Sequence, residues 1–267
     1  MDKKNIITII IIPILSILII IASYYGYTRY LMMRFNINNT AKYANDYLKI
    51  ERANTNKRVI VSLYTSSNSF SSISETINSL LDQTVKPDQI VINAPQDSQL
   101  TIDDFLIKNN IIVLYKLQND YGEIGSLISP LLREKEANTF IILASERVIY
   151  GIEFIERMIG LSLQNPDCMI YSKGYNGKQF ATTNVKVDNA ATNDILDSDY
   201  GILVKPKFFT SAILTEDRFK TLTVLVSSYK ICVKQCQYRE SFLSKSSSNT
   251  EAVKKDILLN SVYLASF

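Results

Sequence analysis

The stretch VIVSLYTSSNSFSSISETINSLLDQTVKPDQIVINAP, Val59 to Pro95, decides the fold class of this chain. It begins with an apolar, β-branched run of strand length and continues through a serine-rich turn into a segment with apolar residues at helical spacing. It ends with a second apolar run bounded by two prolines. A strand, a helix and a second strand in this order form the basic unit of a parallel sheet, so the stretch predicts an α/β domain.

The same alternation continues toward the C-terminus. Further strands are predicted over 111–117, 139–145, 167–174 and 230–236, and helices over 101–110, 126–138, 152–165 and 215–229. The pattern predicts a mostly parallel sheet with helices on both faces. Ligands of such sheets bind beyond the carboxyl ends of the strands, so the residues directly after each strand are the candidates for a site.

An apolar segment precedes the domain. Ile6–Ala22 contains only two polar residues, and Ser23–Tyr27 extend it to the roughly 20 residues that cross a hydrocarbon core, with tyrosines suited to the interface. A cleaved signal peptide is the alternative, but its apolar core is usually shorter and no A-x-A cleavage site follows here. We therefore predict a transmembrane anchor over 6–27.

Basic residues lie on both sides of the predicted anchor. Lys3 and Lys4 precede it, and Arg29 and Arg34 follow it. Because the basic pair at the N-terminus lies nearest to the span, the positive-inside rule favours a cytosolic N-terminus with the domain on the opposite side of the membrane.

These patterns divide the chain into five parts. They are a short N-terminal tail (1–5), the transmembrane anchor (6–27), a polar membrane-proximal stalk (28–57), the α/β domain (58–240), and a mobile serine-rich loop with a C-terminal helix (241–267).

The composition excludes several classes of function. The chain of 267 residues has 29 basic and 26 acidic side chains, a formal charge of +3, which gives no electrostatic case for binding nucleic acid. It has no histidine, which excludes histidine-based catalysis and histidine-ligated metals. Of its three cysteines, Cys232 and Cys236 share a face of the last predicted strand but lie too far apart to bond. We therefore predict that these two and Cys168 are free, buried or half-buried thiols.

Four segments, in order, resemble the glycosyltransferase family 2-like proteins of the GT-A fold. In that family a strand with a threonine-containing end leads into SLLxQT and then PDxIxxxxP, as in Val59–Pro95. The DYG loop and the acidic strand end of the family resemble 119–159, and its later segments resemble 194–209 and 215–226. The resemblance covers roughly 58–237 and implies a degenerate, GT-A-like member of the family.

The resemblance implies transfer of a sugar from a nucleotide sugar to an acceptor hydroxyl. In that reaction negative charge builds on the departing diphosphate, and a divalent metal held by a D-x-D carboxylate pair usually neutralises it. In this chain Ser145-Glu146-Arg147 stands in the place of the acidic triplet. Glu146 is thus the single candidate ligand for Mn²⁺ or Mg²⁺.

This triplet has three interpretations. The site is catalytically dead; or Arg147 replaces the metal as the counter-charge of a phosphate, which a guanidinium binds in a bidentate manner; or the triplet is only a solvated strand end.

The resemblance also implies nucleotide-sugar binding by polar residues after the strands. These are Thr65, Ser66, Asn93 and Asp120, together with Arg147. Ordinary turn chemistry is the alternative explanation for several of them.

Two further carboxylates match the family pair that supplies the catalytic base. With no histidine in the chain, Asp217, adjacent to Glu216, is the candidate to deprotonate the acceptor hydroxyl. The alternative role of Glu216 and Asp217 is to stabilise the first turn of a helix.

The sequence therefore predicts a membrane-anchored glycosyltransferase-like protein with a nucleotide sugar and a glycan or protein acceptor as its partners. The alternative is a catalytically degenerate GT-A-like module that is held at a membrane as a binding or assembly partner. A third hypothesis is a structural domain whose pattern matches the family by chance.

Overall fold

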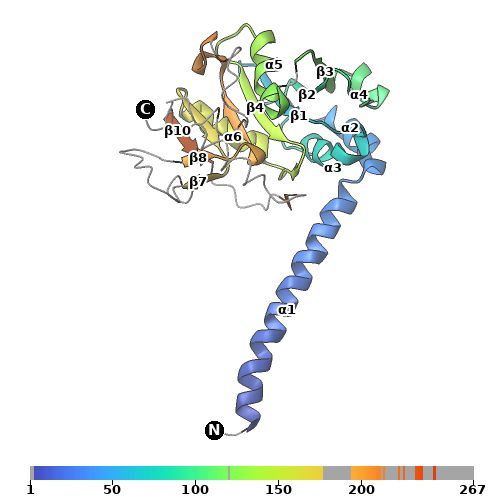
Figure 1. The fold of residues 1–267 in the computed structure, drawn as a ribbon, viewed down its shortest axis with the longest axis vertical. Coiled ribbons are helices and arrows are strands. Elements are labelled where there is room, and N and C mark those ends of the chain that lie inside the picture. Colours follow the sequence, from blue (N-terminus) through green and yellow to red (C-terminus); the bar gives the residue numbers. More distant parts are fainter. Residues whose placement is uncertain are drawn as a thin grey trace.

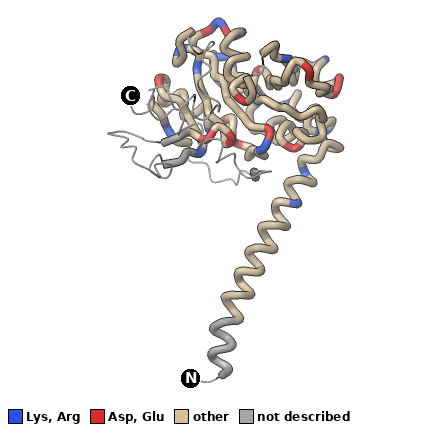
Figure 2. The backbone as a smooth tube through the Cα atoms, in the orientation of Figure 1, with Lys and Arg blue, Asp and Glu red and all other residues tan. Residues whose placement is uncertain are grey.

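A long helix extends from one side of an α/β domain (Figure 1). The computed structural model describes residues 3–119, 121–176, 194–211, 213, 222, 225, 232–236 and 243–244. The long helix, α1, runs over Lys3–Arg34, and its part from Ile11 to Arg34 is long and apolar enough to cross a membrane. In the coloured part of α1, Figure 2 shows charged residues only toward the end that joins the domain.

The domain is built on a seven-stranded sheet in the order β10-β6-β9-β4-β1-β2-β3. Its strands are β1 (Val59–Tyr64), β2 (Gln89–Pro95), β3 (Ile112–Leu117), β4 (Phe140–Ser145), β6 (Cys168–Tyr171), β9 (Ile202–Val204) and β10 (Cys232–Gln235). β9 runs antiparallel to its neighbours β4 and β6, and the other pairs of this sheet are parallel. The predicted mostly parallel sheet is confirmed.

Helices cover both faces of the sheet. α3 (Phe70–Leu81) and α6 (Phe154–Gln164) pack on one face, and α5 (Gly125–Arg133) packs on the other. Alternation along β4 explains the two layers: Ile142 packs in the cluster with α3 and α6, whereas its neighbours Ile141 and Leu143 pack with α5. The prediction of helices on both faces is confirmed.

The remaining described elements are short. They are α2 (Thr40–Tyr47), α4 (Asp104–Lys108), β5 (Val148–Ile149), β7 (Gly174–Asn176), β8 (Asp194–Leu196), β11 (Leu243–Ser244) and 3-10 turns over Ile37–Asn39, Gly122–Ile124, Ser198–Tyr200 and Pro206–Phe208. Of the helix predicted over 215–229, only Leu222 and Leu225 are described, and both are helical and buried. Apart from β11, the predicted C-terminal loop and helix lie outside the described residues.

The segment predicted as a stalk packs onto the domain. Leu31 and Phe35, at the end of α1, are 8% and 5% exposed, and both belong to the core cluster on the α3 face of the sheet. Tyr43 and Tyr47 of α2 are buried in the same cluster. α1 therefore enters the domain without an intervening free linker.

Polar contacts fix this junction as well. Asn78 of α3 is fully buried and donates its side-chain amide to the carbonyls of Phe35 and Asn36 at 2.9 and 3.0 Å. Arg34 forms an ion pair with Asp82 at 2.6 Å. The last carbonyls after α1, which have no partner within the helix, thus find donors on α3.

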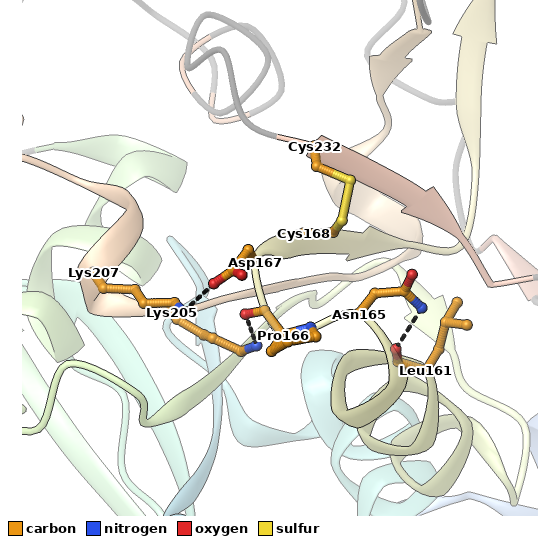
Figure 3. Close-up of a disulfide and its surroundings, with 8 residues drawn as sticks. All are labelled: Leu161, Asn165, Pro166, Asp167, Cys168, Lys205, Lys207 and Cys232. Atoms are coloured by element: carbon orange, nitrogen blue, oxygen red, sulfur yellow. Dashed lines mark hydrogen bonds and ion pairs between the residues drawn. A yellow bond between two sulfur atoms is a disulfide. The ribbon is translucent and has the colours of Figure 1, made fainter.

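Cys168 and Cys232 form a disulfide between β6 and β10 (Figure 3). The two residues lie directly opposite each other in the parallel register of these strands. The prediction of free thiols is therefore wrong for this pair, while Cys236 is free and buried as predicted. Cys168 and Cys232 are 64 residues apart in the sequence and become adjacent only through sheet pairing, so spacing along one strand does not reveal the pair.

Two lysines hold the turn that leads to this disulfide (Figure 3). Lys205 is fully buried and donates to the Pro166 carbonyl at 2.5 Å, and Lys207 pairs with Asp167 at 2.6 Å. Burial, with smaller effects of Lys207 and Lys57, lowers the pKa of Lys205 to about 8. The turn before β6 is thus tied to the segment after β9.

We predict that Asn78→Ala destabilises the domain by about 1–3 kcal/mol, because two carbonyls at a buried junction lose their donor. The measurement is urea unfolding of the full chain in detergent micelles. The control is Asn45→Ala, which removes an exposed amide bonded to the Ala41 carbonyl within α2 and should change stability by less than about 0.5 kcal/mol. Equal losses for both variants would contradict the role of Asn78 at the junction.

Candidate functional site

A small pocket lies where β1 and β4 end. Its lining includes Tyr64, Ser66, Glu123, Asp199 and all three residues of the Ser145–Arg147 triplet. This is the edge at which ligands bind in sheets of this class. The pocket encloses about 100 Å³, well below the roughly 300–1,000 Å³ of ordinary small-molecule sites.

Arg147 is the central charge of the pocket. Its Nη2 lies 2.5 Å from Oε1 of Glu123 and 2.8 Å from Oδ1 of Asp199. The side chains of Arg147 and Asp199 are only 26% and 12% exposed. Burial alone would lower the pKa of Arg147, but the carboxylates of Asp199 and Glu123 outweigh it and raise that pKa above its usual value. The guanidinium is therefore charged and already paired twice, which does not fit the interpretation as a solvated strand end.

Tyr150 ties the triplet to the turn that carries Asp199. Its hydroxyl accepts from the Ser145 N–H at 2.8 Å and donates to the Asp199 carbonyl at 2.9 Å. The fully buried ring stacks on Phe154 with a centroid separation of 4.5 Å. Burial raises the pKa of Tyr150 well above its usual value, so the hydroxyl stays protonated and continues to donate.

Gly201 closes the same turn in a left-handed conformation with φ of 99°. A Cβ at this position would lie 2.5 Å from the Phe154 ring, which is itself buried. Both the backbone angle and the close approach of the ring therefore require glycine here.

Side chains of helix α3 hold the backbone of the triplet and of Tyr150 in place. Thr76 donates its hydroxyl to the Glu146 carbonyl at 2.7 Å, and Ser79 accepts the Tyr150 N–H at 3.0 Å. Both α3 side chains are fully buried. The backbone of the triplet is thus held by groups that have no contact with solvent.

The structure brings together Ser66, Glu146 and Arg147 among the predicted site residues. Thr65 is buried, and its hydroxyl accepts from the Ser67 N–H at 3.0 Å. Asn93 is also buried, and it donates to the Ser62 hydroxyl and the Leu63 carbonyl at 3.0 and 2.9 Å, so that it joins β2 to β1. Neither Thr65 nor Asn93 lines the pocket.

The other predicted site residues lie outside the described residues. They are Asp120, Glu216 and Asp217. Their assigned roles, in nucleotide binding and as the catalytic base, stay predictions.

Sequence reasoning missed the two partners of Arg147. Glu123 follows the DYG loop directly, and Asp199 belongs to the Asp197-Ser198-Asp199 run before Gly201. An acidic run next to a turn glycine was the available signal for Asp199. Its proximity to Arg147, 52 residues earlier, depends on the pairing of β9 with β4.

The described residues do not fit a divalent metal. Among them, no three Asp, Glu or Cys side chains are placed to hold one ion together. Glu123 and Asp199, which lie nearest to the triplet, face the guanidinium of Arg147. Glu146 therefore has no set of companion ligands in this part of the chain.

Comparison with known proteins gives similarity at the level of the fold. No family model and no curated protein matches the chain. Similar solved structures include a 4-diphosphocytidyl-2C-methyl-D-erythritol synthase, with 12% identity and a TM-score of 0.45 over 77% of this chain and 100% of that one. GalNAc-T7 with UDP, GalNAc and Mn²⁺ has 10% identity and a TM-score of 0.44 over 76% of this chain and 48% of that one. S. aureus TarS has 15% identity and a TM-score of 0.43 over 78% of this chain and 39% of that one.

These similar structures are GT-A-like nucleotidyl- and glycosyltransferases. This chain spans less than half the length of the GalNAc-T7 and TarS chains. Similarity at this level carries no information about the chemistry of this chain. The α/β class itself follows from the strand order and the two helical layers.

We predict that Arg147→Met destabilises the domain by about 1.5–3 kcal/mol, because two charged hydrogen bonds are lost and two carboxylates are left facing each other. Thermal unfolding of the full chain is the measurement. The matched control is Arg157→Met, which breaks an exposed pair with Glu153 on α6 and should cost less than about 1 kcal/mol. A loss for Arg147→Met no larger than that of the control would show that the ion pairs do not hold the pocket.

Proposed function

We propose that this chain is a membrane-anchored GT-A-like protein that does not transfer sugars and acts as a binding or assembly module at the membrane. The observation that carries this proposal is the double pairing of Arg147 with Glu123 and Asp199. It favours the catalytically dead interpretation of the Ser145–Arg147 triplet over the counter-charge interpretation.

The charge of the pocket opposes a diphosphate. Among the described residues of the lining, Glu123, Glu146 and Asp199 carry three carboxylates and Arg147 carries one guanidinium, which gives these residues a formal net charge of −2. A diphosphate carries at least two negative charges of its own, and like charges at short range in a partly buried site repel strongly. A nucleotide sugar that approached Arg147 would meet two carboxylates, Glu123 and Asp199, which are both paired with Nη2 of that arginine.

The size of the pocket supports the same proposal. At about 100 Å³ it is smaller than ordinary ligand sites. The backbone carbonyls of two lining residues, Asp199 and Glu146, accept hydrogen bonds from the buried side chains of Tyr150 and Thr76, which hold these walls in place.

The proposal is tested by calorimetric titration of the full chain in detergent with UDP and with GDP, each with and without Mn²⁺. We expect no saturable binding in any of the four experiments. The informative variant is Glu123→Gln with Asp199→Asn, which changes the ionisable lining from −2 to neutral and should gain metal-independent binding of inorganic pyrophosphate. Saturable, Mn²⁺-dependent binding of UDP by the unaltered chain, or turnover of a nucleotide sugar, would refute the proposal and favour a transferase with Asp217 as its base.

The disulfide supports a place for the domain on the oxidising side of a membrane. Disulfides persist in secreted and exoplasmic proteins and are rare in the cytosol. The Cys168–Cys232 bond agrees with the orientation that Lys3 and Lys4 favour, a cytosolic N-terminus with the domain on the opposite side. The proposed arrangement is a single-pass anchor with an exoplasmic domain.

This orientation predicts the number of free thiols in the native chain. When the cells are lysed in denaturant that contains N-ethylmaleimide but no reductant, so that the buried Cys236 becomes accessible, mass spectrometry should find one modified cysteine, Cys236. Prior reduction and unfolding should raise the number to three. Three modified cysteines without reduction would place the domain in a reducing compartment and would overturn the proposed orientation.

A further inference from the structure

The distance from the membrane interface to the domain is short. Tyr24, Tyr25, Tyr27 and Tyr30 of α1 are 48–68% exposed, as expected for an aromatic belt at the interface. Leu31, the residue after the last of them, is already buried in the domain. From Tyr27 to Leu31 the helix rises only about 6 Å, whereas the polar layer of each leaflet is about 5–8 Å thick.

The helix and the domain are joined rigidly at this point. α1 stays helical to Arg34, and Figure 1 shows it meeting the domain beside α2 and α3. Asn39 donates its amide to the carbonyls of Met33 and Arg34 at 3.2 and 2.8 Å, and Asn78 caps the next two carbonyls. A junction with these bonds cannot act as a free hinge that lifts the domain from the membrane.

Exposed apolar side chains gather at this junction. Tyr30, Met32, Met33 and Ile37, which we call the junction face, are 38–58% exposed. Tyr30 and Met33 lie three residues apart on α1 and therefore share one side of the helix. Because the junction face continues directly from the apolar span, the bilayer interface is the surface that can cover it.

We propose that the domain rests directly on the phospholipid bilayer, with the junction face inserted in the headgroup layer. This inference depends on the proposed anchoring by α1. Any partner of the domain must then lie at the membrane surface or within reach of a domain that keeps one orientation to it.

Fluorescence quenching by lipids tests the proposal. The full chain is reconstituted in phosphatidylcholine vesicles with an environment-sensitive fluorophore on an introduced cysteine, under non-reducing conditions that leave the disulfide intact. Met33→Cys reports on the junction face. Leu132→Cys is the control, because Leu132 is 60% exposed on α5, which covers the opposite face of the sheet. Ile19→Cys reports on the span.

The proposal predicts that a headgroup-attached nitroxide lipid quenches the Met33 label several-fold more strongly than the Leu132 label. A nitroxide near the end of the acyl chain should quench the Ile19 label most. If the Ile19 label is quenched but the Met33 label is quenched no more than the Leu132 label, the proposal that the domain rests on the bilayer is wrong, although α1 still spans the membrane. No quenching at Ile19 would refute the anchor itself, and the inference with it. If Met33→Cys does not fold, Ile37→Cys reports on the same face with the same expected result.

Discussion

The structure depends on a set of buried polar side chains on helix α3 and just after its end. Each is at most 2% exposed, and each bonds to a backbone group that is distant in sequence: Thr76 to the Glu146 carbonyl, Asn78 to the end of α1, Ser79 to the Tyr150 N–H, and Gln83 to the Gly151 carbonyl and the Ile155 N–H. A buried polar group without a partner costs several kcal/mol, so the sequence of α3 leaves these distant segments little freedom of position. The end of α1, the pocket and the start of α6 are thereby fixed relative to one helix.

That constraint explains how Arg147 stays paired with two carboxylates. Arg147 lies on a turn whose backbone is held by Thr76 and Tyr150, so its guanidinium reaches carboxylates from two other segments without a large loss of freedom. Pairing in a partly buried site is favourable when the geometry is set in advance, because the entropy of ordering has already been lost. A site that must receive a diphosphate needs the opposite arrangement, with positive charge left unpaired until the ligand arrives.

Local pattern was enough to predict the elements but not their neighbours. The strand predicted at the start of the stretch Val59–Pro95 is observed over Val59–Tyr64, because β-branching and burial act within a few residues. The insertion of β9 between β4 and β6, and the pairing of β10 with β6, are decided by contacts between distant segments. The disulfide and the approach of Asp199 to Arg147 both depend on those pairings, so neither could be read from spacing. The burial of Phe35 and Tyr43 could not be predicted for a related reason. Most residues around them in the sequence are polar, and only the tertiary packing places these two side chains in the core.

The junction between α1 and the domain and the paired charges of the pocket have a common physical basis. Sites that bind charged ligands usually keep unpaired charges and strained turns, and these lower the stability of the protein. In this chain the guanidinium of Arg147, after the end of β4, is paired with the carboxylates of Glu123 and Asp199. The turn that carries Arg147 is held by a hydrogen bond from α3. The end of α1 is held by the same helix, through the amide that Asn78 donates to the carbonyls of Phe35 and Asn36.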